Sequence, residues 1–266
     1  SIGCNIAYHL TELGLTDVVV LERDKLTSGT TWHAAGEIVP AVLGAEWECK
    51  LYLHGRNLIA GLEAETGQAT GWREVGYIQP ADTHERIEEM RRGAAFMRLQ
   101  GIEVHEISPK EAAERFPIGD FSNTLAAFWY PKEGRTNPVD TTMALARGAR
   151  NRGAKVFEDI AVKDILTRDG RAVGVRTDQG DIAAEHVVIA AGMWSRQIGA
   201  QAGLNLPLQA AEHYYLITEQ IEGLPRDLPL LEDPHNWSYY REEVGGLLVG
   251  LFEPDAAPWM VDAIPE

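Results

Sequence analysis

The first 22 residues of the chain, from Ser1 to Glu22, read SIGCNIAYHLTELGLTDVVVLE. Apolar residues recur at helical spacing up to Gly14, which is a typical C-terminal stop for a helix. The β-branched run at 17–22 ends in an acid and is typical of a buried parallel strand. A helix followed by such a strand is half of a βαβ unit, so the sequence predicts an α/β fold. We interpret the chain as a fragment of a longer protein that lacks the first strand of this unit.

Gly3 and Glu22 have the spacing of a dinucleotide-binding fingerprint. Gly3 stands where the third glycine of G-x-G-x-x-G would allow close helix–strand packing, and the helix N-terminus attracts a pyrophosphate. Glu22 follows 19 positions later, near the position of the acid that binds a ribose hydroxyl. Alone, the two residues are equally a helix glycine and a surface glutamate. With the strand between them they predict a nucleotide site, and the acid disfavours NADP.

Composition excludes several classes of partner. The formal net charge is −16, whereas nucleic acid and anionic membranes require a basic face. No apolar run is long enough for a membrane-spanning helix. The only cysteines are Cys4 and Cys49, which rules out a disulfide framework and a four-cysteine zinc site and favours a reducing compartment. The histidines show no metal-ligand spacing, so no metal site is expected.

The remaining pattern suggests one nucleotide domain interrupted by a second domain. Helices are expected at 45–66, 83–100, from Ser108, and from Asn137 to about residue 152. Strands are expected at 72–80, 154–158, 161–167, 172–177 and 181–184, near residue 187 before a turn at Gly192, and at 208–218, 236–241 and 246–252. A hairpin turn is expected at Asp169-Gly170. We assign residues 1–70 and 137–205 to the nucleotide domain, and 71–136 and 206–266 to an incomplete second domain.

The loop after Glu22 carries the most specific signal. Residues 26–36 read LTSGTTWHAAG and offer hydroxyls and unhindered backbone N–H groups that suit a phosphate or a flavin. His33, taken alone, is more often a solvent-facing or structural histidine.

With Glu22, this loop closely resembles the dimethylglycine dehydrogenase and sarcosine dehydrogenase family, which belongs to the D-amino-acid-oxidase-like flavoproteins. The resemblance continues at Ala190-Ala191-Gly192-Met193-Trp194-Ser195 and at 213–219. It implies an FAD-binding Rossmann-like domain of the glutathione-reductase type with an inserted antiparallel-sheet α+β substrate domain. It also implies FAD bound covalently, through a ring nitrogen of His33 and the 8α carbon of the flavin.

Further residues are implied to contact FAD. Val162 is expected to contribute a backbone contact near the adenine, although an ordinary sheet valine is about equally expected. The whole implied set is Gly3, Glu22, Arg23, Ser28, Gly29, Thr30, Thr31, His33, Ala35, Gly36, Val162, Ala191, Gly192 and Trp194.

The family reaction is oxidation of an N-methyl amino acid by hydride transfer to flavin N5. An amine with a pKa near ~10 is protonated at neutral pH, and losing that proton costs ~4 kcal/mol, so a base near neutrality is useful. His213 is the candidate base, and Tyr239 is favoured over Tyr240 as the active-site tyrosine. A strand histidine bonded to the backbone and ordinary aromatic sheet packing are the structural alternatives. Arg241 could bind the substrate carboxylate, but a solvated surface charge is the more frequent role of such a residue.

Partners and rival functions follow from the same resemblance. The substrate would be dimethylglycine or sarcosine, and the electron acceptor an electron-transfer flavoprotein or oxygen. A missing C-terminal domain could bind tetrahydrofolate. The expected location is the cytoplasm of a bacterium or the mitochondrial matrix of a eukaryote. The rivals are another amine or amino-acid oxidase with non-covalent FAD, and a non-catalytic regulatory relative.

Overall fold

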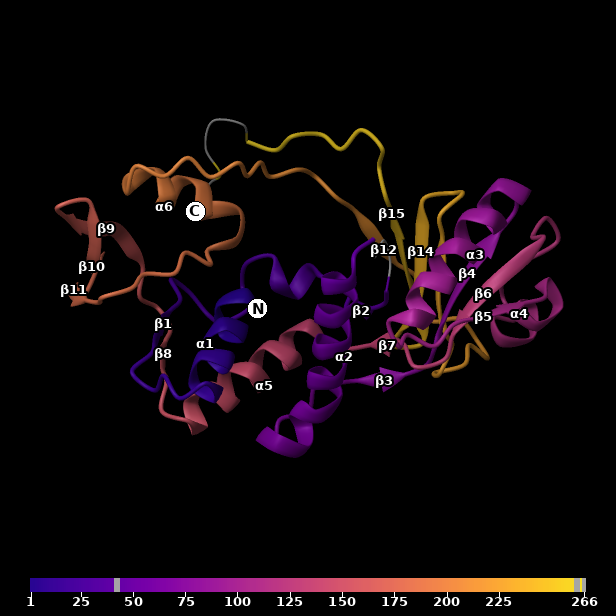
Figure 1. The fold of residues 1–266 in the computed structure, drawn as a ribbon, viewed down its shortest axis with the longest axis horizontal. Coiled ribbons are helices and arrows are strands. Elements are labelled where there is room, and N and C mark those ends of the chain that lie inside the picture. The colour runs from indigo at the N-terminus through magenta and orange to yellow at the C-terminus, as the bar shows by residue number, and fades with distance from the viewer. Residues whose placement is uncertain (41–43, 261–263, 265–266) are drawn as a thin grey trace.

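The computed structural model describes residues 1–40, 44–260 and 264. Figure 1 shows a mixed α/β chain with small sheets at one end, helices in the middle and a larger sheet at the other end. The short strands β1 (Val19–Leu21) and β8 (Lys155–Phe157) pair in parallel, as expected for the start of a βαβ unit. Beside them lies an antiparallel sheet of β9 (Val162–Arg168), β10 (Arg171–Thr177) and β11 (Gly180–Ala183). Asp169 and Gly170 form the predicted turn of its first hairpin, both with positive φ.

Three helices form the middle of the chain: α1 (Ile2–Glu12), α2 (Glu46–Thr66) and α5 (Pro138–Asn151). α5 begins at the predicted site, because the Asn137 side chain accepts hydrogen bonds from the backbone N–H groups of Val139 and Asp140. Gly148 lets α1 approach α5 closely, since a Cβ there would lie 2.7 Å from the ring of Tyr8. Gly148 on α5 therefore allows α1 to pack closely, and the N-terminal end of α1 is the expected phosphate site.

The large sheet has the strand order β12-β15-β14-β13-β4-β6-β5. All neighbours are antiparallel except β13 and β4, which are parallel. The strand bounds are β4 (Tyr77–Ala81), β5 (His105–Ile107), β6 (Ala126–Tyr130), β12 (Tyr215–Ile217), β13 (Leu230–Asp233), β14 (Ser238–Glu243) and β15 (Gly246–Leu251). The helices α3 (His84–Leu99) and α4 (Pro109–Arg115) complete this part of the chain.

The two faces of the large sheet have different surroundings. Ile78 and Leu231 pack on one face with Ala112 of α4. Tyr77, Leu230 and Phe128 lie on the other face with residues of α2 and α3. Strand pairing places Tyr239 opposite Glu232 and Gly250, so the side chains of Tyr239, Glu232 and Tyr77 share this second face. The second face therefore carries polar groups of the expected substrate domain.

A small sheet of β2 (Glu37–Ile38), β7 (Gly134–Arg135) and β3 (Arg73–Glu74) follows the motif loop. The backbone N–H of Thr136 donates to the carbonyl of Gly36, and Glu37 pairs with Arg135. The residues just after the motif loop are thus held beside the start of α5 and next to the strands of the large sheet (Figure 1).

Of the expected strands, one is absent from the residues that the structure describes, and another is shorter than predicted. A strand was expected near residue 187, but the segment 187–190 belongs to no sheet in the described part of the chain. Of the expected strand at 208–218, Tyr215–Ile217 pairs with β15, and Ala211 forms a single antiparallel bridge with Pro258. Two short 3-10 helices, η1 (Thr31–His33) and η2 (Gly192–Trp194), and α6 (Ser195–Gln201) are the remaining elements.

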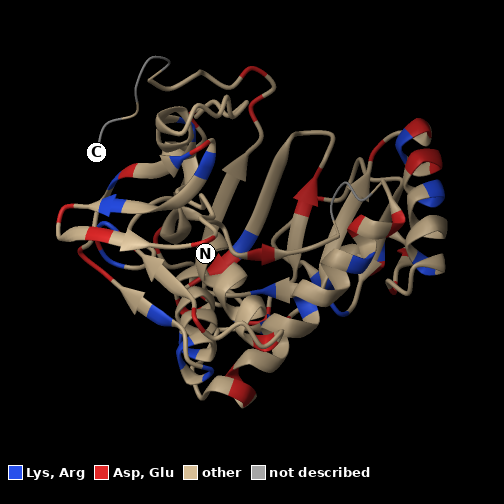
Figure 2. Cartoon of the chain, turned by 60° about the vertical axis from the view of Figure 1, so that its left-hand side comes forward, with Lys and Arg blue, Asp and Glu red and all other residues tan. Residues whose placement is uncertain are grey.

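Lys and Arg positions are interspersed among Asp and Glu positions along the chain (Figure 2). Within the described ranges, no helix combines the length and the apolar composition that crossing a membrane requires.

Candidate functional site

The N-terminal end of α1 lies against the segment that precedes η2. A Cβ at Gly3 would lie 3.5 Å from the Cβ of Ala190, an ordinary contact that places this end of the helix beside the segment and would also admit a small side chain. The terminal amino group of Ser1 donates a hydrogen bond of 3.0 Å to the hydroxyl of Thr31 in η1. The structure therefore brings the helix N-terminus, the motif loop and the segment before η2 together.

A second set of implied FAD contacts gathers around Trp194. The guanidinium carbon of Arg23 lies 4.3 Å from the centroid of the Trp194 ring, a cation–π contact. A Cβ at Gly29 would lie 3.5 Å from this ring, and one at Gly192 would lie 4.0 Å from the Thr30 hydroxyl. The loop after β1 and the turn at η2 are thus adjacent, although about 160 residues separate them in the chain.

Glu22 directly follows β1. Its backbone N–H donates to the carbonyl of Phe157, and its carbonyl accepts from Ile160. The carboxylate accepts a 3.1 Å hydrogen bond from the backbone N–H of Asp24 through Oε1. Val162 opens β9, five residues after the end of β8. Ser28 and Ala35 belong to the same loop and its exit, between β1 and β2.

His33 is exposed at the end of η1, and its ring packs against Trp32 at a tilt of 33° with the centroids 3.6 Å apart. An exposed imidazole can be reached by a bulky ring system such as isoalloxazine. Gly36 follows with a φ of +74°, and a Cβ there would lie 2.3 Å from the carbonyl oxygen of Thr136. Only glycine fits between the motif loop and the start of α5.

His213 and Tyr239, the candidate catalytic residues, form one hydrogen-bonded group. His213 Nε2 lies 3.3 Å from the Tyr239 hydroxyl, and His213 Nδ1 lies 3.0 Å from Glu253 Oε2. The Phe252 ring packs against both, at centroid distances of 6.0 Å from His213 and 5.0 Å from Tyr239. The hydrogen bond to His213 lowers the pKa of Glu253, so this carboxylate is an acceptor at neutral pH.

These contacts fix the direction of each hydrogen bond when the imidazole is neutral. Nδ1–H then donates to Glu253, which leaves Nε2 as an acceptor for the hydroxyl of Tyr239. Tyr239 is only 5% exposed, and burial raises its pKa to about 12. The phenol therefore remains protonated and acts as a donor, while His213 is the group that can accept a proton.

Two charged residues that the sequence analysis missed or misplaced lie near Tyr239. The expectation that Arg241 is a solvated surface charge is wrong, because it is only 7% exposed on β14, where it pairs with Glu243. Glu37 was not singled out at all. Burial raises its pKa to about 8, with a further increase from Glu232 and a decrease from Arg241. The one signal in the sequence was its position directly after Gly36.

The described residues fit an FAD molecule in several places. Gly3 lies at the helix N-terminus, the carboxylate of Glu22 has one hydrogen bond, to Oε1, among the described residues, and His33 has an exposed ring. Among the described residues, no group of three or more His, Cys, Asp and Glu side chains is arranged to hold a metal ion.

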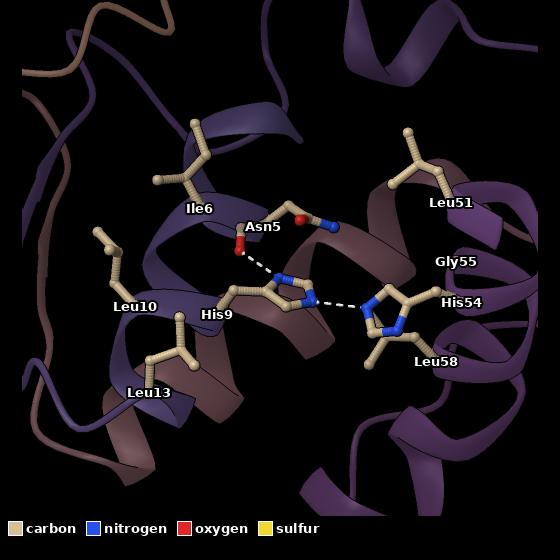
Figure 3. A pocket seen from close by; sticks show the side chains of 9 residues that line it. All are labelled: Asn5, Ile6, His9, Leu10, Leu13, Leu51, His54, Gly55 and Leu58. Carbon is tan, nitrogen blue, oxygen red and sulfur yellow. Dashed lines mark hydrogen bonds between the residues drawn. The ribbon is translucent and has the colours of Figure 1, made fainter. Parts of the chain in front are cut away.

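A cavity of about 460 Å³ lies elsewhere, between α1 and α2 (Figure 3). His9 and His54 face each other there with their Nε2 atoms 2.9 Å apart, and His9 Nδ1 lies 2.9 Å from the carbonyl of Asn5. The two ring nitrogens meet nearly head-on, which suits a shared proton rather than a metal between them. None of the lining residues is one of the predicted site residues.

A family model described as "DAO: FAD dependent oxidoreductase" matches residues 1–265. The chain belongs to this family. The expected fold class is therefore confirmed, and members of the family depend on FAD.

Three curated relatives show which members of this family the chain resembles. 4-Methylaminobutanoate oxidase (formaldehyde-forming) from Paenarthrobacter nicotinovorans is 36% identical over 99% of this chain and 32% of its own length. Mitochondrial sarcosine dehydrogenase from Mus musculus is 36% identical over 97% of this chain and 29% of its own length. Mitochondrial dimethylglycine dehydrogenase from Rattus norvegicus is 35% identical over 99% of this chain and 32% of its own length. These matches confirm the resemblance, and the chain spans about a third of the length of these curated relatives.

A solved structure supports the fold of this oxidoreductase chain. The crystal structure of L-proline dehydrogenase from P. horikoshii superimposes with a TM-score of 0.87 at 27% identity, over 96% of this chain and 68% of that one.

Proposed function

We propose that the protein oxidises N-methyl amino acids, with dimethylglycine and sarcosine as the first candidates, and that His33 carries its FAD covalently. The hydrogen-bonded pair of His213 and Tyr239 carries this proposal, because it sets a proton acceptor and a buried donor on one face of the large sheet. The names of the relatives support an N-methylated substrate.

The residues that would hold FAD come from three segments. The N-terminus of α1, opened by Gly3, suits the pyrophosphate, and Glu22 suits a ribose hydroxyl. The Trp194 turn with Arg23 lies beside the motif loop. FAD, when bound, supplies the acceptor for the hydride taken from the N-methyl carbon. The protein's own task is to orient the amine and to remove its proton.

His213 suits the removal of that proton. A protonated amine has no lone pair to assist loss of a hydride, so a base must act first. The His213 side chain is half-exposed, with 45% of its surface accessible, and Glu253 Oε2 lies 3.0 Å from its Nδ1 atom. Tyr239 donates to the neutral ring and holds its orientation from the opposite nitrogen.

Two alternatives remain as rival proposals. A related amine or amino-acid oxidase would keep FAD without a covalent bond to His33. A regulatory relative would keep the fold without catalysis. An electron-transfer flavoprotein or oxygen would accept the electrons of an active enzyme, and tetrahydrofolate would bind only in a part outside the described residues.

The test is acid precipitation of the FAD-supplemented protein, followed by flavin absorbance in the pellet. We expect flavin to remain with the wild type and with His186→Ala, an exposed histidine in the same part of the chain, and to be lost with His33→Ala. Release of flavin from the wild type would favour the non-covalent oxidase. No flavin in either fraction would favour the regulatory relative.

A further inference from the structure

The carboxyl group of Glu37 is placed where the motif loop meets the large sheet. Glu37 opens β2 directly after Gly36, four residues beyond His33. Its side chain is partly buried, and its Oε1 atom is buried without a hydrogen-bond partner among the described residues. A buried acceptor without a partner is costly, so native structures seldom leave one unless a ligand or water completes it.

The charged and titratable groups around Glu37 come from three strands. Glu232 on β13, Tyr239 and Arg241 on β14, and Tyr77 on β4 interact electrostatically with it or with each other.

Each of the charged neighbours already has a partner. Glu232 accepts hydrogen bonds from Tyr77 and Gln79. Arg241 is paired with Glu243. Arg241 Nε and Glu37 Oε1 are the buried atoms of this set without a hydrogen-bond partner among the described residues, and Glu37 is the one of the two that can attract a cation.

We propose that Glu37 is the counter-ion of the substrate nitrogen: its carboxyl O–H bond breaks when a methylated ammonium group binds beside Tyr239, and the proton leaves to the solvent. The carboxylate then faces the cation. The inference rests on the proposed function for the identity of the substrate.

Binding of a cation should make Glu37 lose its proton, so that one positive charge replaces another at the site. In the empty site Glu37 is mostly neutral at pH 7, since its pKa is raised to about 8. A cation at short distance stabilises the ionised form and lowers this pKa. The site would therefore bind a cationic nitrogen without keeping a permanent buried charge.

Trimethylglycine is the appropriate probe because its nitrogen has no proton to lose and no lone pair to be oxidised. Its binding to the FAD-loaded protein is measured by titration calorimetry at pH 7 in two buffers with different ionisation enthalpies. We expect release of about 0.9 proton per ligand, the protonated fraction of a group with a pKa of about 8.

Variants assign that proton to a residue. Glu37→Gln is expected to release none and to bind trimethylglycine at least about 10-fold more weakly, as the loss of one close charge pair predicts. Glu37→Asp should retain the release. Glu74→Gln is the matched control, because Glu74 is exposed on β3 of the same small sheet. It should match the wild type.

Three results would overturn the inference: no binding by the wild type, binding without proton release, or equal release by Glu37→Gln. Proton uptake would also overturn it, because a carboxyl that is already mostly protonated at pH 7 has almost no proton left to take up. A different result would refute the proposed function and not this inference. A wild type that binds trimethylglycine with proton release but oxidises no N-methyl amino acid would refute the function and leave this assignment standing.

Discussion

The ring of Tyr239 lies over Gly250, its register partner on the neighbouring strand: a Cβ at Gly250 would stand 1.9 Å from the Tyr239 ring carbon Cζ and 2.2 Å from its hydroxyl oxygen. Gly250 in turn pairs with Tyr215 on β12, two residues beyond His213. The missing side chain at Gly250 is therefore what lets Tyr239 reach across β15 to His213.

Replacing Gly250 with alanine should displace the Tyr239 ring. We expect kcat/KM for an N-methyl amino acid to fall about 10- to 100-fold in Gly250→Ala, because a misplacement near 1 Å costs that much. Steady-state kinetics with FAD-loaded protein measures this. Gly93→Ala on α3, where nothing lies within 4 Å, should retain activity. Full activity of Gly250→Ala would show that the overlap has no part in the reaction.

Glu242 should stabilise the chain far more through Arg135 than through Arg226. Glu242 is buried and pairs with Arg135, whose side chain is 12% exposed, whereas the side chain of Arg226 is 59% exposed. Removing the carboxylate leaves the guanidinium of Arg135 without its charged partner. Glu242→Ala should therefore lower the free energy of unfolding by about 3–5 kcal/mol. Arg226→Ala should cost less than about 1 kcal/mol. Urea denaturation compares them, and equal losses would refute this ranking.

Glu37 should make the stability of the protein decrease as the pH rises. Its folded pKa of about 8 lies above the ordinary value of 4.5, so the native state binds more protons than the unfolded state between these values. The stability contributed by the neutral carboxyl is complete below about pH 4.5 and is lost as the pH passes 8. We expect Glu37→Gln to gain about 2–4 kcal/mol relative to the wild type between pH 5 and 8.5, allowing for partial exposure. Urea denaturation across this range measures it, and parallel curves would contradict the assignment.

Gly36→Ala should weaken both folding and flavin binding. The positive φ and the 2.3 Å approach to the carbonyl of Thr136 leave no room for a methyl group. A loss of at least about 1–3 kcal/mol in the free energy of unfolding is expected from the strained backbone. Flavin content per protein should fall, because the loop that carries His33 must shift. Gly61→Ala, on α2 with nothing within 4 Å, is the control that should keep its flavin.

Local patterns in the sequence predict the helices well. The long helix ends at Gly67 with a left-handed φ of 69°, and Ser108 caps α4 through the backbone N–H of Glu111. These signals are contained within one turn of the chain. His213 and Tyr239 were paired as candidates only through resemblance, since 26 residues separate them.

What the sequence does not show depends on distant contacts. β13 was not predicted, because four residues flanked by prolines show no periodicity, and only its pairing with β4 and β14 makes it a strand. The burial of Arg241 is similar, since its environment is made by its neighbours in the sheet rather than by adjacent residues. The same holds for Glu37, whose pKa depends on Glu232 and Arg241 from other strands.

The unpaired segment 187–190 and the short strand β1 have a consequence for handling the 266-residue polypeptide. β1 is hydrogen-bonded to β8 alone in the described part of the chain, and Val19 and Val188 are 40% and 60% exposed. Apolar strand edges with open backbone groups template the addition of further strands, including those of another copy. Expressed by itself, this polypeptide should therefore self-associate through these edges, and its solubility should depend strongly on concentration.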